Sequence, residues 1–160
     1  MRARMRRIVA IVLMAVACAA AAALPEGHDQ LPSGEWKAIQ QVIGDQLKAL
    51  KAGDGTKAIT YSAPGIRQQF RTPERFLRMV REGYSALLDA RSSTFLEGAV
   101  IGGETIQPLQ LVLPDNTVVV ALYTMVKVRD GQKEGLRDGQ RGGNWRIAGC
   151  VIAPSKSQST

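Results

Sequence analysis

The stretch that decides the fold runs from Trp36 to Tyr84 and reads WKAIQQVIGDQLKALKAGDGTKAITYSAPGIRQQFRTPERFLRMVREGY. At its start, large apolar residues recur at steps of three or four positions, which places them along one side of an α-helix. These residues are Trp36, Ile39, Ile43, Leu47 and Leu50. Most of the positions between them are polar and suit the side that faces water. The spacing therefore predicts an amphipathic helix that packs on a core.

The residues around this helix are typical of helix ends. Ser33 is expected to be the N-cap, with Glu35 in the first turn, where the helix dipole stabilises a negative charge. Gly53 suits the position after the last turn. Asp54 is expected to cap a short second helix, which the Pro-Gly pair at 64–65 ends.

A third helix is predicted after Thr72, which is a good N-cap, because Pro73 at the first helical position loses no needed donor. Its apolar face carries Phe76, Val80, Tyr84 and Leu87. Five arginines lie mostly off that face: Arg67, Arg71, Arg75, Arg78 and Arg81. Such a set could bind an anion, but a solvated helix surface is the simpler interpretation.

The second half of the chain has the alternation and turn residues of a sheet. Strands are expected at 94–101, 105–113, 117–128 and 144–152. Pro108 predicts that its strand is at an edge or is bulged, and Gly149 marks a candidate bulge. The strand at 117–128 is apolar on both faces, which is typical of a central strand that is covered on both sides. Helices followed by strands predict an α+β fold, with three helices packed on a curved antiparallel sheet of about four strands.

The first 23 residues are typical of a secretory signal peptide. Four arginines at positions 2–7 precede an apolar run at 8–14, and the small residues Ala21–Ala23 suit a cleavage site. This segment predicts a periplasmic or secreted protein of a Gram-negative bacterium, with no stable membrane span once the signal is removed. The alternatives are an uncleaved anchor and a lipoprotein anchored through Cys18, because residues 15–18 vaguely resemble a lipoprotein cleavage box.

Signal removal would change the charge and the cysteine content of the chain. Four of the 21 Lys and Arg residues would be lost, leaving 17 against 14 Asp and Glu, so the net charge would fall from +7 to about +3. This near balance removes most of the support for a nucleic-acid-binding protein. Cys150 would remain without a disulfide partner, and its apolar strand predicts a buried, inert thiol. We expect a linker at 24–33, one domain at 34–153 and a disordered tail at 154–160.

Several short motifs along this domain match the pattern of a protein family. They are Trp36-x-x-Ile39, Gln46-Leu47-x-Ala49-Leu50, Gly53-Asp54, Ala58, Ser62-x-Pro64-x-Ile66-x-x-x-Phe70, Phe76-x-x-Met79-Val80, Tyr84 and Trp145-Arg146-Ile147-x-Gly149-Cys150. Together they resemble the DUF4864 family of bacterial domains of unknown function, over nearly all of the chain that follows the signal. The resemblance implies an α+β cone of NTF2-like, or cystatin-like, type. It supplies no catalytic residues, and the charged, Gly-rich segment at 129–143 is longer than the family pattern implies.

The chemistry available to the predicted domain is limited. His28 is the only histidine and lies in the linker, so a Ser-His-Asp or Cys-His site inside the domain is excluded. Cys150 alone cannot form a structural zinc site, a histidine-based metal site is not expected, and no glycine motif for phosphate binding occurs. The sequence therefore predicts neither a metal nor a cofactor.

These observations leave three functional hypotheses. The leading one is a non-enzymatic binding or accessory module with a pocket for a small apolar ligand between the helices and the sheet. Its candidate lining residues are Tyr61, Tyr84, Tyr123 and Trp145. The alternative is an isomerase or dehydratase in which a buried Glu97 is the single proton-transfer base, although a Glu97 that faces water is the simpler interpretation. The third is a homodimer formed through the sheet.

Overall fold

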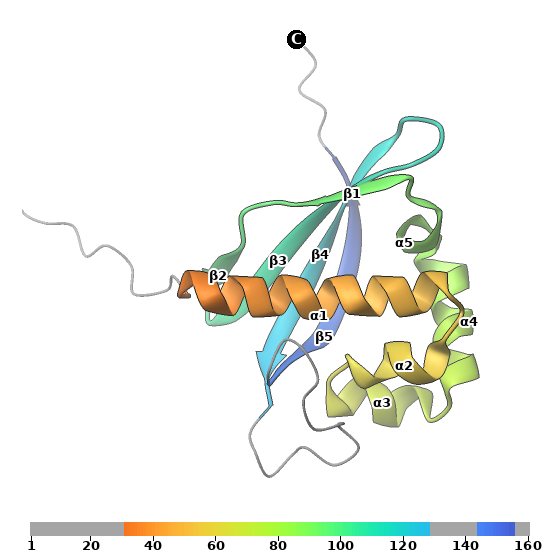
Figure 1. Ribbon diagram of the computed structural model, residues 1–160, viewed down its shortest axis with the longest axis horizontal. Helices are drawn as coiled ribbons and strands as arrows, with labels where there is room; N and C mark the ends of the chain where they lie inside the picture. Colours follow the sequence, from red (N-terminus) through yellow and green to blue (C-terminus); the bar gives the residue numbers. More distant parts are fainter. Residues whose placement is uncertain (1–30, 129–143, 156–160) are drawn as a thin grey trace, which may run out of the picture.

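The computed structural model describes residues 31–128 and 144–155. The first part of this chain is helical and contains α1 (Ser33–Lys51), α2 (Gly55–Thr60), α3 (Pro64–Phe70), α4 (Pro73–Gly83) and α5 (Ser85–Asp89). The strands that follow are β1 (Ser92–Phe95), β2 (Ala99–Ile101), β3 (Glu104–Val112), β4 (Val118–Lys127) and β5 (Trp145–Pro154). Helix α1 crosses one face of the twisted sheet, α2 and α3 lie alongside its C-terminal half, and α4 and α5 lie near its C-terminal end (Figure 1). The predicted α+β class is confirmed, and the NTF2-like cone stays a prediction.

Several sequence-based predictions concern residues outside the described ranges. These are the signal peptide, the linker as far as residue 30, the Gly-rich segment at 129–143 and the tail from residue 156.

The helical half is divided more finely than the three predicted helices. Pro64 begins α3 instead of ending a helix, because a proline at the first helical position lacks only a donor that would be unpaired anyway. The predicted third helix is interrupted at Tyr84, which has a φ of −137° and separates α4 from α5. This interruption turns the Tyr84 side chain toward β5.

The helix ends confirm most of the predicted caps. The Asp54 side chain accepts a hydrogen bond from Lys57 N at 2.9 Å, and Thr72 Oγ1 accepts one from Arg75 N at 3.3 Å. Gly53 has a φ of 70°, a conformation that glycine adopts without strain. The prediction for Ser33 was wrong: Pro32 is the residue before the first turn, and no side chain caps α1.

The sheet has the strand order β1-β3-β4-β5, with β2 also paired to β3, and its pairs are antiparallel. Strand β3 therefore lies inside the sheet, and the predicted edge position of Pro108 was wrong. Residues 96–98, which connect β1 to β2 and lie opposite Gln107 and Pro108, are not paired with β3 in the ladder. A proline cannot donate to a ladder, which accounts for a break at this position.

The predicted strand at 94–101 is split into β1 and β2 at the point where the chain contacts α1. Gly98 lies against the indole of Trp36, where an added Cβ would be 2.3 Å from Cζ3 of the ring. The Gln107 amide donates to Leu96 O at 2.7 Å and so holds the chain between the two strands. These contacts join residues far apart in sequence, so the local pattern could not predict the split.

Within residues 31–128 and 144–155, strand β4 is covered on one face only, whereas the sequence predicted a strand covered on both faces. Its inner residues Ala121, Tyr123 and Met125 are buried beneath the helices. On the opposite face, Leu122 is 36% exposed and Val151 of β5 is 63% exposed. The described chain therefore leaves an apolar outer face on the sheet.

Two groups of buried side chains form the interior. The larger joins the α1 stripe, including Ile39 and Ile43, to the inner face of the sheet. The smaller lies among the helices and contains Ala49, Leu50, Ala58, Phe76 and Val80. Burying a side chain such as Ile or Leu contributes about 1.5–3 kcal/mol, so the predicted stripe is a main source of stability.

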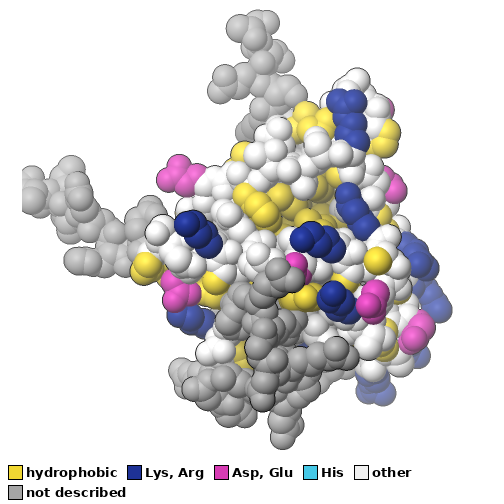
Figure 2. Space-filling model, viewed as in Figure 1, with side chains coloured by type: hydrophobic (Ala, Val, Ile, Leu, Met, Phe, Trp, Pro, Cys, Tyr) yellow, Lys and Arg dark blue, Asp and Glu magenta, His cyan; other side chains and the backbone are white. Residues whose placement is uncertain are grey.

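The exposed side of the helix layer is polar and charged. Figure 2 shows Lys and Arg side chains along the side of the molecule that α4 forms. Of the five arginines predicted to lie on a solvated surface, Arg71, Arg75, Arg78 and Arg81 are exposed. Arg67 is half-buried, so the prediction was wrong for this residue.

Candidate functional site

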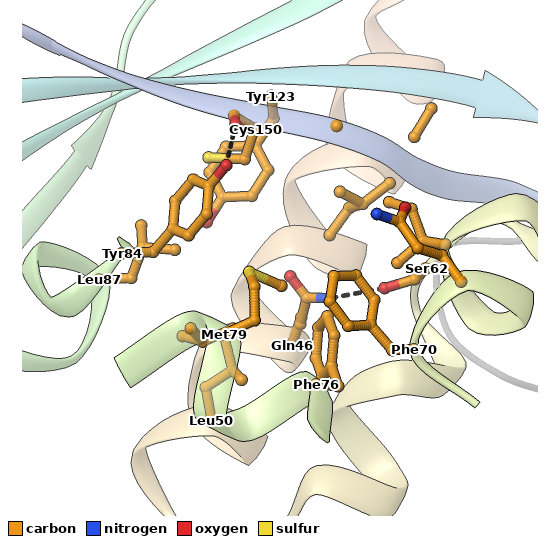
Figure 3. Close-up of a pocket in the computed structure, with 16 residues that line it drawn as sticks. Gln46, Leu50, Ser62, Phe70, Phe76, Met79, Tyr84, Leu87, Tyr123 and Cys150 are labelled. Carbon is orange, nitrogen blue, oxygen red and sulfur yellow. Dashed lines mark hydrogen bonds between the residues drawn. The ribbon is translucent and has the colours of Figure 1, made fainter. Parts of the chain in front are cut away.

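A pocket of about 380 Å³ lies between the C-terminal half of α1, helices α3 and α4, and strand β5 (Figure 3). Its apolar lining residues are Leu50, Ile66, Phe70, Phe76, Met79, Val80, Leu87, Ile147 and Ala148. Its polar lining residues are Gln46, Ser62, Gln69, Tyr84 and Tyr123. Gly149 and Cys150 complete the lining. No lining residue in the described chain carries a charge, so residues 31–128 and 144–155 offer no counter-ion to a charged ligand.

The apolar wall comes mainly from α4 and the residue that ends α3. The Thr72 cap sets the start of α4, and positions three and four apart from Phe76 then face the pocket. The Phe70 and Phe76 rings meet edge to face with centroids 5.8 Å apart, a favoured arrangement of aromatic pairs. This contact fixes the two rings at one end of the wall.

Strand β5 reaches the pocket through a bulge. Thr124 pairs with Gly149 and Met125 pairs with Ile147, so Ala148 is an extra residue without a partner on β4. The predicted irregularity at Gly149 is thus confirmed. Extra residues of this kind bend a strand and re-aim its side chains.

The segment before α3 extends the edge of β5 as far as this bulge. Ile147 N donates to Tyr61 O at 2.9 Å, and Ala63 N donates to Ile147 O at 2.8 Å. Ser62 lies between these two bonds, is 1% exposed and lines the pocket. The junction of Ser62 with the bulge therefore forms one corner of the pocket.

Two hydrogen bonds hold polar side chains at opposite ends of the pocket. Gln46 Nε2 donates to Ser62 Oγ at 3.2 Å, and the Tyr84 hydroxyl donates to Cys150 O at 3.1 Å (Figure 3). The second bond uses a backbone oxygen on the edge strand of the sheet. Both bonds connect a helix-layer residue to another segment, and so they fix the width of the pocket.

Tyr123 and Cys150 are adjacent ionisable groups in a buried environment. Burial, followed by the nearby Cys150, raises the pKa of Tyr123 well above its ordinary value. Burial also raises the pKa of Cys150 to about 12, and the neighbouring Tyr123 hydroxyl opposes this change by a smaller amount. Both groups therefore keep their protons at neutral pH, as the inert-thiol interpretation of Cys150 requires.

The Tyr123 hydroxyl has no hydrogen-bond partner of ordinary geometry within the described residues. Its ring extends from β4 toward the helix layer, beside Tyr84 (Figure 3). A thiol is only a weak hydrogen-bonding group, so Cys150 compensates poorly for the desolvated hydroxyl. Burial of the Tyr123 hydroxyl without a strong hydrogen-bond partner therefore lowers the stability of the folded state.

The four aromatic residues predicted to line a pocket divide into two pairs. Tyr84 and Tyr123 line it. Tyr61 and Trp145 are buried in the core and do not, and the Trp145 indole N–H donates to Glu35. Aromatic type alone could not separate these pairs, because the bulge and the Tyr84 interruption decide which rings reach the pocket.

Glu97 lies on the surface in the connection between β1 and β2 and does not line the pocket. The sequence placed it inside a strand, which the Gly98 contact with Trp36 prevents. The buried carboxylate of the enzyme hypothesis is therefore absent from this position.

The family relationship covers the described part of the chain from Ser33 onward. The family described as "Domain of unknown function (DUF4864)" matches residues 33–160. The chain belongs to the DUF4864 family. No curated protein and no solved structure matches the chain.

The pocket of this DUF4864 domain also contains residues that were not predicted to line it, above all Gln46. It occupies a position of the α1 stripe, three residues after Ile43 and four before Leu50, and it is 4% exposed. A polar residue within an apolar stripe is the signal that could have identified it.

The described part of the DUF4864 domain contains neither a metal-binding cluster nor a helix that could cross a membrane. Among residues 31–128 and 144–155, no three His, Cys, Asp or Glu side chains are grouped to hold a metal ion. No helix in these ranges has the length and apolar character that crossing a membrane requires.

Proposed function

We propose that this DUF4864 protein is an exported binding module whose pocket holds a small, mainly apolar and uncharged molecule. The observation that carries the proposal is the pocket of about 380 Å³ with its apolar walls and uncharged described lining. Pockets for small molecules have volumes of about 300–1,000 Å³ and combine apolar walls with a few polar groups. A ligand of the size of a substituted naphthalene suits this volume.

The ionisable groups of the pocket favour binding over proton transfer. A proton-transfer catalyst works best with a pKa near the operating pH. Burial moves the pKa of Tyr123 and of Cys150 away from that range, and Glu97 is outside the pocket. These features support a non-enzymatic role.

The binding proposal is tested by titrating the protein with naphthalene and observing backbone amide signals by NMR. We expect saturable shifts at Ala148, Gly149 and Cys150, which line the pocket. Met79→Trp should abolish them, because Met79 is a half-buried lining residue whose enlargement fills the space. Leu88→Trp is the matched control, since Leu88 is half-buried in the same helical cluster but does not line the pocket. Unchanged affinity in Met79→Trp would show that the ligand binds elsewhere.

Export is supported by the sequence of residues 1–23 alone. Mass spectrometry of the protein from a periplasmic fraction should give a chain that begins at Leu24. A lipid-modified chain that begins at Cys18 would establish the lipoprotein alternative. Recovery of the intact chain from the cytoplasm alone would contradict export.

A further inference from the structure

The orientation of the Gln46 side-chain amide is fixed by its neighbours. Its Nε2 lies 3.2 Å from Ala58 O and 3.2 Å from Ser62 Oγ. A backbone carbonyl can only accept a hydrogen bond, so the atom that faces Ala58 must be the amide nitrogen. Both N–H groups are used in this way, and Oε1 is left on the other side of the amide. Figure 3 shows the Gln46 nitrogen toward Ser62 and the oxygen turned away from it.

This oxygen has no donor within the described part of the chain. No hydrogen bond of those residues ends on Gln46 Oε1, although the side chain is only 4% exposed. Oε1 is also not among the unpartnered atoms that the described residues enclose completely. Since Gln46 lines the pocket, the pocket is the space from which a donor can approach.

The surroundings of Oε1 define the chemistry of such a donor. The residues beside Gln46 in the pocket include Leu50, Phe76 and Met79, and no described lining residue is charged. An ammonium group would lose its hydration there without gaining a counter-ion. A neutral hydroxyl or N–H group on an apolar body satisfies the oxygen at a much smaller desolvation cost.

We propose that the pocket selects an uncharged, mainly apolar molecule with an O–H or N–H group that donates to Gln46 Oε1. This inference rests on the proposed binding function and adds the polar group that the ligand must carry. Phenols, alcohols, amides and indoles of suitable size share this chemistry. Ethers and hydrocarbons of the same shape lack it.

The test compares three probes on the unaltered protein by NMR titration or calorimetry: 2-naphthol, 2-methoxynaphthalene and naphthalene. We expect 2-naphthol to bind roughly tenfold more tightly than either of the others, since the others leave Oε1 unpaired. Naphthalene controls for the added bulk of the methoxy group. Equal affinities of 2-naphthol and naphthalene would overturn this inference but leave the binding function intact. If none of the three binds, both proposals fail.

Two variants assign the preference to Gln46. Gln46→Leu should lose the preference for 2-naphthol, measured as the ratio of the naphthalene and 2-naphthol dissociation constants within the variant, which should fall from about tenfold to about one. It also loses the bonds to Ala58 and Ser62. Ser62→Ala is therefore the control, because it removes one of these bonds but keeps Oε1, and it should retain the preference. Loss of the preference in Ser62→Ala alone would assign recognition to Ser62 and overturn the inference. If Gln46→Leu does not fold, the comparison of probes on the unaltered protein still decides.

Discussion

Nζ of Lys127 lies 2.7 Å from Oε1 of Glu35, although 92 positions separate these residues in the chain. The other carboxylate oxygen of Glu35 accepts a hydrogen bond from the Trp145 indole, and the Lys127 ammonium is 5.5 Å from the centroid of that ring. The contact ties the first turn of α1 to the adjacent ends of β4 and β5. The hydrogen bond from Lys127, followed by the one from Trp145, lowers the pKa of Glu35.

This lowered pKa predicts a loss of stability in acid. A carboxyl group whose pKa is lower in the folded state contributes stability above its unfolded pKa and loses it as the pH falls through the folded pKa. We expect the free energy of unfolding to decrease as the pH drops below about 4.5, the ordinary value for Glu. Glu35→Gln should be less stable at neutral pH by roughly 0.2–1 kcal/mol, because the ion pair is partly exposed. It should also lose less stability on acidification, as measured by urea unfolding at a series of pH values.

Asp115 supplies the control for this pH dependence. Hydrogen bonds from Thr117 lower the pKa of Asp115 as well. The protonation of Asp115, which lies in a separate turn, therefore also reduces the stability of the fold in acid. Asp115→Asn should therefore reduce the acid slope independently of Glu35→Gln. A Glu35→Gln protein with the full slope of the unaltered protein would contradict the role of Glu35.

The close approach of Gly98 to Trp36 predicts opposite effects of two Gly→Ala changes. A Cβ at residue 98 would overlap the indole, and forcing apart such a contact costs about 1–3 kcal/mol. Gly44 lies within α1 with no atom within 4 Å of its would-be Cβ. Gly44→Ala should stabilise by about 0.5–1 kcal/mol, because alanine favours the helix. Thermal unfolding measures both changes, and a Gly98→Ala protein as stable as Gly44→Ala would refute the packing argument.

Tyr84 and Tyr123 should respond differently to loss of the hydroxyl. Tyr84→Phe removes the hydrogen bond to Cys150 O and should cost about 0.5–1.5 kcal/mol. Tyr123→Phe removes a buried hydroxyl without a partner among the described residues, so the stability should stay the same or rise. Urea unfolding of the two variants gives the comparison. A larger loss in Tyr123→Phe than in Tyr84→Phe would mean that the Tyr123 hydroxyl is well hydrogen-bonded in the native protein.

The parts of the fold that the sequence predicted depend on local chemistry. The spacing of Ile39, Ile43 and Leu47 predicts α1, and the side chains of Asp54 and Thr72 cap helices where expected. These features need only neighbours within a few positions. The class of the fold follows because such helices must cover an apolar sheet face.

The parts that the sequence missed depend on contacts between distant segments. Gly98 lies outside the strands and packs against Trp36, which is 62 positions earlier in the chain. The pocket forms where Ser62 meets the bulge of β5, and neither its position nor the inward turn of Gln46 follows from local spacing. Tyr84 and Tyr123 were identified by residue type. They reach the same site because Tyr123 of β4 pairs with Cys150 of β5, and Tyr84 donates a hydrogen bond to the backbone oxygen of Cys150.

The homodimer predicted from the sequence has a candidate surface in the outer face of the sheet. Leu122 and Val126 of β4 and Val151 of β5 are exposed there, on the face opposite the helices. If two copies pack through this face, light scattering will give twice the mass of one chain. Leu122→Lys should reduce the measured mass to that of one chain, because the lysine charge would be buried at the contact. Leu96→Lys is the matched control: Leu96 is 37% exposed against 36% for Leu122, but it lies in the connection between β1 and β2. A single-chain mass for the unaltered protein, or an equal effect of both lysines, would contradict a dimer through this face.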